Sequence, residues 1–184
     1  MKKRFFTILI LITIFSFILD NLIVKYITDN RIFSLDDIIT KSSILTNGFF
    51  SLIVIGIIIL VWKRKLILDY LIGFGITAII IQLLKVIIQR PRPYLTLNLI
   101  SLIPEKIGFS FPSGHAGFAF FALGFIWNKF PRFKWLWLFI TIFISFSRIY
   151  IGIHYLSDIL ASAIIGLFIG SYFSKHNFFK RFIP

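Results

Sequence analysis

Three ionisable side chains are grouped in the segment SRIYIGIHYLSD, residues 147–158, between two long apolar runs. Arg148, His154 and Asp158 stand out because the whole chain has only three histidines and seven acidic residues. His154 and Asp158 are four residues apart, so their side chains can meet across one turn if a helix begins near Tyr155. Asp158 would then accept the proton of one ring nitrogen of His154 and leave the other nitrogen free as a nucleophile.

The segment KVIIQRPRP, residues 85–93, contributes two cations, Lys85 and Arg92, and Arg148 is a third. Phosphoryl transfer requires positive charge around the phosphoryl oxygens, an in-line nucleophile and a proton for the leaving oxygen. The three cations can supply the charge, since guanidiniums suit bidentate phosphate contacts and lysine acts as a compact point charge. Arg90 lies beside them, and the sequence leaves open whether it binds phosphate or faces solvent.

The segment PSGH, residues 112–115, has the composition of a helix start. Ser113 can cap such a helix, and Gly114 lets free backbone N–H groups approach an anion. His115 belongs to a different segment from His154. It is therefore the candidate for protonating the leaving oxygen and later deprotonating the attacking water.

Together the three segments resemble the complete signature of the type 2 phosphatidic acid phosphatase family. They occur in the family's order and match it at Lys85, Arg92 and Pro93, at Pro112 to His115, and at Ser147, Arg148, His154 and Asp158. The resemblance implies a lipid phosphate or diphosphate phosphatase that forms a phosphohistidine on His154. For the lipid it suggests undecaprenyl diphosphate, which we favour, or phosphatidic acid, phosphatidylglycerophosphate or a lipid A phosphate.

The elements that must position these segments are membrane helices. A mean hydropathy of +0.94 and 58% hydrophobic residues place the chain among polytopic membrane proteins. No linker or repeat divides it, so we expect an all-α fold in which residues 1–184 form a single six-helix bundle. The apolar runs predict transmembrane helices near residues 5–24, 44–62, 66–88, 114–128, 133–150 and 155–173.

The basic residues predict the orientation of these helices. Twelve of the twenty lie in short segments at one end, namely Lys2, Lys3, Arg4, Lys63, Arg64, Lys65, Lys129, Arg132, Lys134, Lys175, Lys180 and Arg181. By the positive-inside rule this end, with both termini, is cytoplasmic, so the net charge of +13 does not indicate nucleic-acid binding.

The three motifs are then expected at the outer face of the cell membrane. Lys85 follows Lys65 by 20 residues. That is about 30 Å of helix, the thickness of the hydrocarbon core. Residues 25–41 and 94–111 are the only outer loops long enough to cover the site.

Other interpretations are open from the sequence alone. A non-catalytic lipid-phosphate binder or a transporter could use the same cations, and Lys85 or Arg148 alone could be an interfacial anchor. Soluble vanadium haloperoxidases have a similar anion pocket, but a chain this short and apolar disfavours that chemistry. Asp158 is the only carboxylate in the motifs, so we expect neither a metal nor another cofactor. No obligate protein partner is evident.

One further pattern predicts helix packing rather than chemistry. Ser162, Gly166 and Gly170 recur every four residues within the last apolar run. Small residues at this spacing allow two membrane helices to approach closely.

Overall fold

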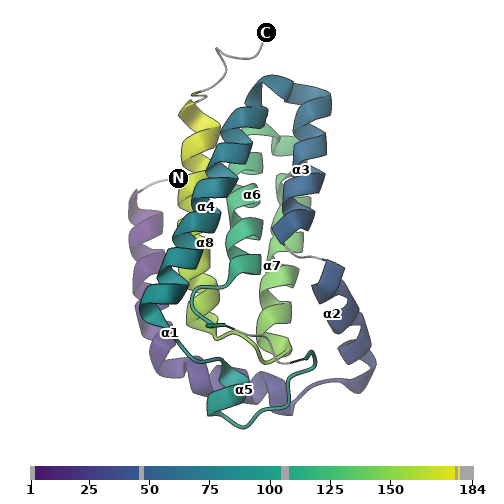
Figure 1. Cartoon of the computed structure of the whole chain (residues 1–184), viewed down its shortest axis with the longest axis vertical. Coiled ribbons are helices and arrows are strands. Elements are labelled where there is room, and N and C mark those ends of the chain that lie inside the picture. The colour runs from purple at the N-terminus through teal and green to yellow at the C-terminus, as the bar shows by residue number, and fades with distance from the viewer. Residues whose placement is uncertain (1–2, 46–47, 105–107, 177, 179–184) are drawn as a thin grey trace.

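The computed structural model describes residues 3–45, 48–104, 108–176 and 178, and this part of the chain is helical without strands. Its elements are α1 (Lys3–Asp29), α2 (Phe33–Leu45), α3 (Gly48–Lys63), η1 (Arg64–Leu66), α4 (Ile67–Ile88), α5 (Pro93–Thr96), α6 (Gly114–Lys129), η2 (Pro131–Phe133), α7 (Lys134–Tyr150) and α8 (Leu156–His176). The long helices run roughly parallel or antiparallel, and α5 lies at the end away from the start of α1 and the end of α8 (Figure 1).

Each of the six predicted apolar runs falls largely within a helix, with boundaries that differ by a few residues. Four helical stretches are long and apolar enough to cross a membrane: Arg4–Asp29, Leu52–Thr96, Pro131–Tyr150 and Leu156–His176. The second of these contains most of α3 and all of α4, whereas α6 has only 16 residues. The all-α, membrane-spanning prediction is confirmed, and the count of six crossings in one bundle stays a prediction.

The expected first outer loop, residues 25–41, is a point where the sequence interpretation was wrong. Helix α1 continues to Asp29, and α2 occupies Phe33–Leu45. The interpretation missed α2 because it searched for apolar runs of bilayer length. This helix has 13 residues and carries Asp36 and Asp37, so its hydropathy does not distinguish it from a polar loop.

Helices α6 and α8 pack against each other through small residues. A side chain added at Gly166 would lie 2.6 Å from the backbone nitrogen of Phe121, and one at Gly124 would lie 2.9 Å from the carbonyl oxygen of Leu167. Both obstacles are backbone atoms, which cannot move aside as a flexible side chain can. The close packing predicted from the small-residue spacing is confirmed, and it fixes the starts of α6 and α8 relative to each other.

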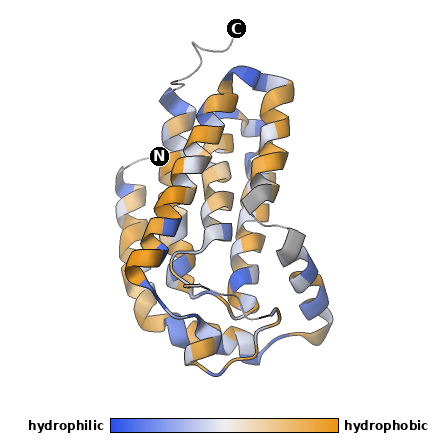
Figure 2. Ribbon diagram, in the orientation of Figure 1, coloured by the Kyte–Doolittle hydropathy of each residue, from blue (hydrophilic) through white to orange (hydrophobic). Residues whose placement is uncertain are grey.

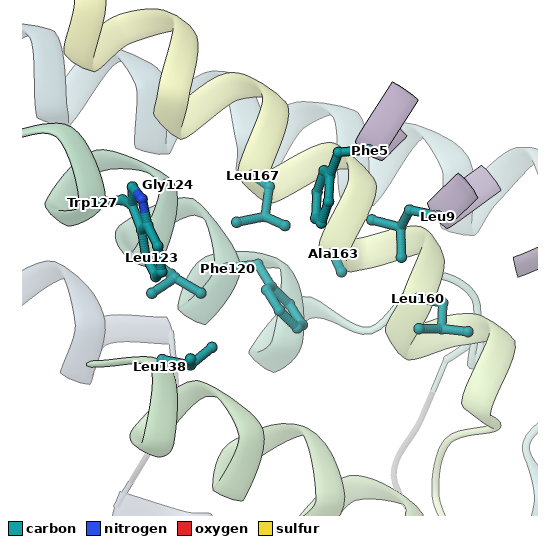
Figure 3. A pocket seen from close by; sticks show the side chains of 10 residues that line it. All are labelled: Phe5, Leu9, Phe120, Leu123, Gly124, Trp127, Leu138, Leu160, Ala163 and Leu167. Atoms are coloured by element: carbon teal, nitrogen blue, oxygen red, sulfur yellow. The ribbon is translucent and has the colours of Figure 1, made fainter. Parts of the chain in front are cut away.

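The sides of the molecule are mainly apolar, and its two ends are more hydrophilic. Apolar residues cover most of the long helices, and the hydrophilic residues concentrate at the two ends (Figure 2). A pocket of about 420 Å³ lies between α1, α6, α7 and α8, and its lining includes Phe5, Phe120, Leu138 and Leu160 (Figure 3). No charged side chain lines this pocket, so the cations and histidines of the motifs must act elsewhere.

Candidate active site

The turn between α7 and α8 presents His154. Gly152 has φ +88°, a left-handed conformation that favours glycine, and it reverses the chain after α7 ends at Tyr150. The Nδ1 atom of His154 lies 3.3 Å from Oδ2 of Asp158, which also accepts a hydrogen bond from the Tyr155 amide at 2.9 Å. The contact expected from the four-residue spacing is therefore present, and the second ring nitrogen of His154, Nε2, is not used by it.

The surroundings of His154 favour the neutral imidazole. The side chain is only 3% exposed, and burial lowers the pKa of His154 to about 4. Asp158 opposes this shift, while the positive charges of Arg92 and Lys85 add to it. At neutral pH the ring therefore keeps an unprotonated nitrogen, which a nucleophile requires.

The start of α6 is attached to α8 by hydrogen bonds. The Ser113 amide donates to the carbonyl oxygen of Asp158 at 3.3 Å, and the Ser162 hydroxyl donates to the carbonyl oxygen of Ser113 at 2.9 Å. His115 follows in the first turn of α6 and is partly exposed. The PSGH and SRIYIGIHYLSD segments thus meet at one end of the helices.

Ser113 stands at the N-cap position of α6, but the expected side-chain cap is absent. Its hydroxyl is instead buried and has no hydrogen-bond partner among the described residues. A methyl group added at Gly114 would meet only the ring of Phe118, at 4.0 Å, so the space beside this glycine is open. A buried hydroxyl without a hydrogen-bond partner, at a helix N-terminus and beside open space, is a feature of an anion site.

Lys85 and Arg92 are held by backbone carbonyl groups. Lys85 Nζ donates to Phe109 at 2.7 Å, and Arg92 donates to Gly108 and Ile153, each at 3.1 Å. Within the ranges that the structure describes, neither cation forms an ion pair with a carboxylate. Neutral partners leave the positive charge available for an anion.

Arg148 is fully buried and lies against α2. Its Nη2 donates to the carbonyl oxygen of Ser43 at 3.2 Å, and its Nε donates to the Ser147 hydroxyl at 3.2 Å. The remaining nitrogen, Nη1, has no partner in the described part of the chain. In the described part of the chain the Arg148 side chain donates to Ser147 and Ser43, whereas Arg92 donates to Ile153, the residue next to His154, so the structure brings Arg148 less directly to His154 than Arg92.

Sequence reasoning missed Asp20, which contacts this site, and did not establish the role of Arg90. Arg90 pairs with Asp158 at 2.8 Å and with Asp20 at 2.7 Å, so the solvent-facing interpretation of Arg90 was wrong. The available signal was an acidic residue within the first apolar run. Ionisable residues at such positions usually have partners and functions.

The fold and this site define a helical membrane protein that gathers cations and histidines at one end of its helices. A model of the PAP2 superfamily matches residues 66–182, and the chain belongs to this superfamily. The matched range includes the three motifs and leaves out α1, α2 and α3.

Individual relatives agree with this placement. The chain is 34% identical over 108 residues to the bacitracin transport permease protein BcrC of Bacillus licheniformis, covering 57% of this chain and 53% of the relative. It is 28% identical over 118 residues to an undecaprenyl-diphosphatase of Sulfolobus acidocaldarius, covering 61% and 56%. The chain thus spans about half the length of these curated relatives.

The fold is also similar to that of a solved structure, Aquifex aeolicus LpxE. The TM-score is 0.75 with 23% sequence identity, over 86% of this chain and 96% of that chain. At this identity the likeness establishes the fold alone.

Proposed function

We propose that this chain is a membrane lipid phosphatase that uses His154 as its nucleophile. The observation that carries the proposal is the buried contact between His154 Nδ1 and Asp158, which engages one ring nitrogen and leaves Nε2 for the substrate, close enough to Arg92 and Lys85 for their charges to lower the pKa of the ring. A binding protein needs the cations but has no need of a neutral, oriented imidazole. A carboxylate that orients a histidine in this way is a recurring device of nucleophilic and acid–base catalysis.

In the first step the phosphoryl group binds between Lys85, Arg92, Arg148 and the start of α6. The Nε2 atom of His154 attacks phosphorus, an N–P bond forms, and the bond from phosphorus to the leaving oxygen breaks. His115 donates a proton to that oxygen. Asp158 stabilises the positive charge that develops on the His154 ring.

In the second step water hydrolyses the phosphohistidine. The now neutral His115 removes a proton from water, whose oxygen attacks phosphorus as the N–P bond breaks. Inorganic phosphate leaves, and both histidines return to their starting protonation states. The side-chain cations and the Ser113 hydroxyl stabilise the phosphoryl oxygens, so the proposed chemistry needs no metal or other cofactor.

The proposed protein is one domain of six membrane-crossing helices, α1, α3, α4, α6, α7 and α8, with both termini in the cytoplasm. The distribution of basic residues supports this orientation, because the turns between α3 and α4 and between α6 and α7 are both basic. The site lies at the other end, where α4 and α7 finish and α6 and α8 begin (Figure 1). It therefore faces the extracytoplasmic side.

The proposed substrate is a lipid phosphomonoester or diphosphate that reaches the site from the bilayer. We favour undecaprenyl diphosphate, and the name of the Sulfolobus acidocaldarius relative supports this choice. Phosphatidic acid, phosphatidylglycerophosphate and a lipid A phosphate are the alternatives. The reaction requires no partner protein.

A transporter or binder of lipid phosphates is the second candidate, and the Bacillus licheniformis relative is named as a transport permease, for bacitracin. Turnover separates the two functions. Purified protein in detergent micelles should release inorganic phosphate from undecaprenyl diphosphate faster than from the other three lipids. The release should survive EDTA, be inhibited by vanadate and disappear in His154→Ala. A protein that binds these lipids without releasing phosphate would establish the second function instead.

A further inference from the structure

The two carboxylate oxygens of Asp158 face different groups. Oδ2 faces His154 Nδ1 at 3.3 Å and accepts from the Tyr155 amide at 2.9 Å. Oδ1 accepts a hydrogen bond from Arg90 Nη1 at 2.8 Å. Asp158 is fully buried, so the guanidinium of Arg90 supplies the hydrogen bond and the charge that water would otherwise provide.

Arg90 is itself fixed on three sides. Its Nη2 pairs with Oδ2 of Asp20 at 2.7 Å, and its Nη1 also donates to the Ser157 hydroxyl at 2.6 Å. The guanidinium carbon lies 3.8 Å from the ring centroid of Tyr155, within the range of a cation–π contact. A guanidinium held by two carboxylates and an aromatic ring has little freedom to leave Asp158.

Asp20 belongs to α1 and reaches the start of α8. Its Oδ1 accepts a hydrogen bond from the Ser157 amide at 2.9 Å, and its Oδ2 accepts one from the Ser157 hydroxyl. That amide belongs to the first turn of α8, where backbone N–H groups lack helical partners. Asp20 therefore caps α8 from another helix, and the negative charge at a helix N-terminus is favourable.

The charges of Asp20, Arg90 and Asp158 explain why Arg90 pairs with both carboxylates. Asp20 is 1% exposed and Asp158 is fully buried, and one guanidinium lies between them. Without Arg90, two buried carboxylates would lack compensation. Without the carboxylate of Asp20, Arg90 would lose one of the groups that hold it in place, and Asp158 would be oriented less firmly toward His154.

We propose that Asp20 is a positioning residue that acts through Arg90 and Ser157 to hold Asp158 and, through Asp158, the reactive tautomer of His154. The inference rests on the function proposed above. It brings α1 into the catalytic centre, although this helix lies outside the range that the superfamily model matches. The alternative is that Asp20 only attaches α1 to α8.

The test compares Asp20→Asn and Arg90→Gln with Ser16→Ala, a matched change in α1. Ser16 is also buried, but its hydroxyl donates within α1 to the carbonyl oxygen of Thr13. If Asp20 positions His154, Asp20→Asn lowers kcat about 10- to 100-fold, as losses of supporting hydrogen bonds commonly do. In Asp20→Asn, KM and the inhibition constant for inorganic phosphate should stay within about twofold of the wild-type values, because the proposed phosphate-binding cations are unchanged. Ser16→Ala should match wild type.

The tautomer of His154 provides a second readout that does not depend on turnover. The chain has only three histidines, so ¹⁵N labelling of histidine gives three ring systems to assign by NMR. In wild type the His154 ring should carry its proton on Nδ1, whereas Asp20→Asn and Arg90→Gln should mix the two tautomers. If Asp20→Asn does not fold, Asp20→Glu keeps the charge and should retain more of the Nδ1 tautomer than Arg90→Gln.

The outcomes separate this inference from the proposed function. An Asp20→Asn protein with wild-type kcat and tautomer overturns the positioning role. Loss of kcat with a lower unfolding temperature and an unchanged tautomer makes Asp20 a structural attachment and also overturns it. A wild-type protein that hydrolyses none of the lipids removes the proposed function, and the tautomer comparison still decides the role of Asp20.

Discussion

Ser113 and Asp158 are joined by a backbone hydrogen bond, in which the Ser113 amide donates to the Asp158 carbonyl oxygen at 3.3 Å. The bond links the start of α6 to the first turn of α8. His115 lies two residues beyond one partner, and His154 lies four residues before the other. The two histidines therefore lie at the same end of the helices but in separate segments, which suits them to separate roles.

Replacing each histidine should distinguish those roles. His154→Ala should abolish turnover of alkyl and aryl phosphates alike, because no leaving group compensates for a missing nucleophile. His115→Ala should keep part of the first step with an aryl phosphate, whose phenol leaves without protonation. The measurements are steady-state phosphate release and the burst of phenol.

The His115→Ala protein should also accumulate phosphohistidine, because its second step lacks a base. The label on His154 should be acid-labile and stable to base. Equal loss of aryl and alkyl phosphate hydrolysis in both variants, with no label in either, would contradict the assignment. Label on His115 in the His154→Ala protein would reverse the roles.

The titration of His154 gives a prediction with a definite sign. Burial lowers the pKa of His154 to about 4, so the ring should stay neutral as the pH falls from 7 to 5.5. A histidine with the ordinary pKa of about 6.5 would be about 90% protonated at pH 5.5. The ¹⁵N shifts of the His154 ring should therefore change little over this interval, and a midpoint near 6.5 would show that the site is hydrated.

The same shift links pH to stability. Because the folded-state pKa of His154 lies below the unfolded value, the unfolded chain binds the extra proton first. The contribution of His154 to stability is therefore complete above about pH 6.5 and decreases as the pH falls towards 4. The free energy of unfolding in detergent can be measured against pH in wild type and His154→Gln. It should decrease more steeply below pH 6.5 in wild type.

Glycines in contact with backbone should differ from glycines beside open space. Gly166→Ala places a methyl group against the backbone of α6 and should destabilise the protein by about 1–3 kcal/mol, the usual cost of overpacking. Gly56 is the matched control, since a side chain there would meet nothing within 4 Å. The thermal unfolding temperature in detergent should be lowered by Gly166→Ala and not by Gly56→Ala. Equal unfolding temperatures for the two variants would contradict the close packing of α6 and α8.

Cysteine labelling can test the proposed topology cleanly, because the chain contains no cysteine. Ile100→Cys lies in the loop after α5, where the native side chain is 79% exposed, and should react with an impermeant maleimide in intact cells. Lys65→Cys lies in the turn between α3 and α4 and should react only after lysis. The opposite pattern would place the site in the cytoplasm.

The positions of the long helices could be predicted because each coincides with an apolar run, which is a local property of the sequence. The contact between His154 and Asp158 could be predicted for the same reason, since four residues make one helical turn. Helix α2 could not, because it is short and polar and its place depends on packing.

The contacts of Arg90 with Asp20 and of Arg148 with Ser43 join residues 70 and 105 positions apart. Contacts between residues so far apart in the sequence leave no periodic pattern in it. The sequence therefore indicated the cations but not their partners. Ser113 was expected to cap α6 because its residue type and position fit an N-cap. Among the described residues its hydroxyl has no hydrogen-bond partner, and propensity alone does not show whether an N-cap serine makes the capping bond.

The 16 residues of α6 make it about 24 Å long, whereas the hydrocarbon core of a bilayer is about 30 Å thick. If its basic C-terminal end is anchored at the inner interface, its first turn is submerged by about 6 Å. Mismatch of this kind is relieved by local thinning of the membrane. Activity in vesicles should therefore decrease as the acyl chains of the host lipid are lengthened, which makes bilayer thickness a determinant of how readily a polar headgroup reaches His154.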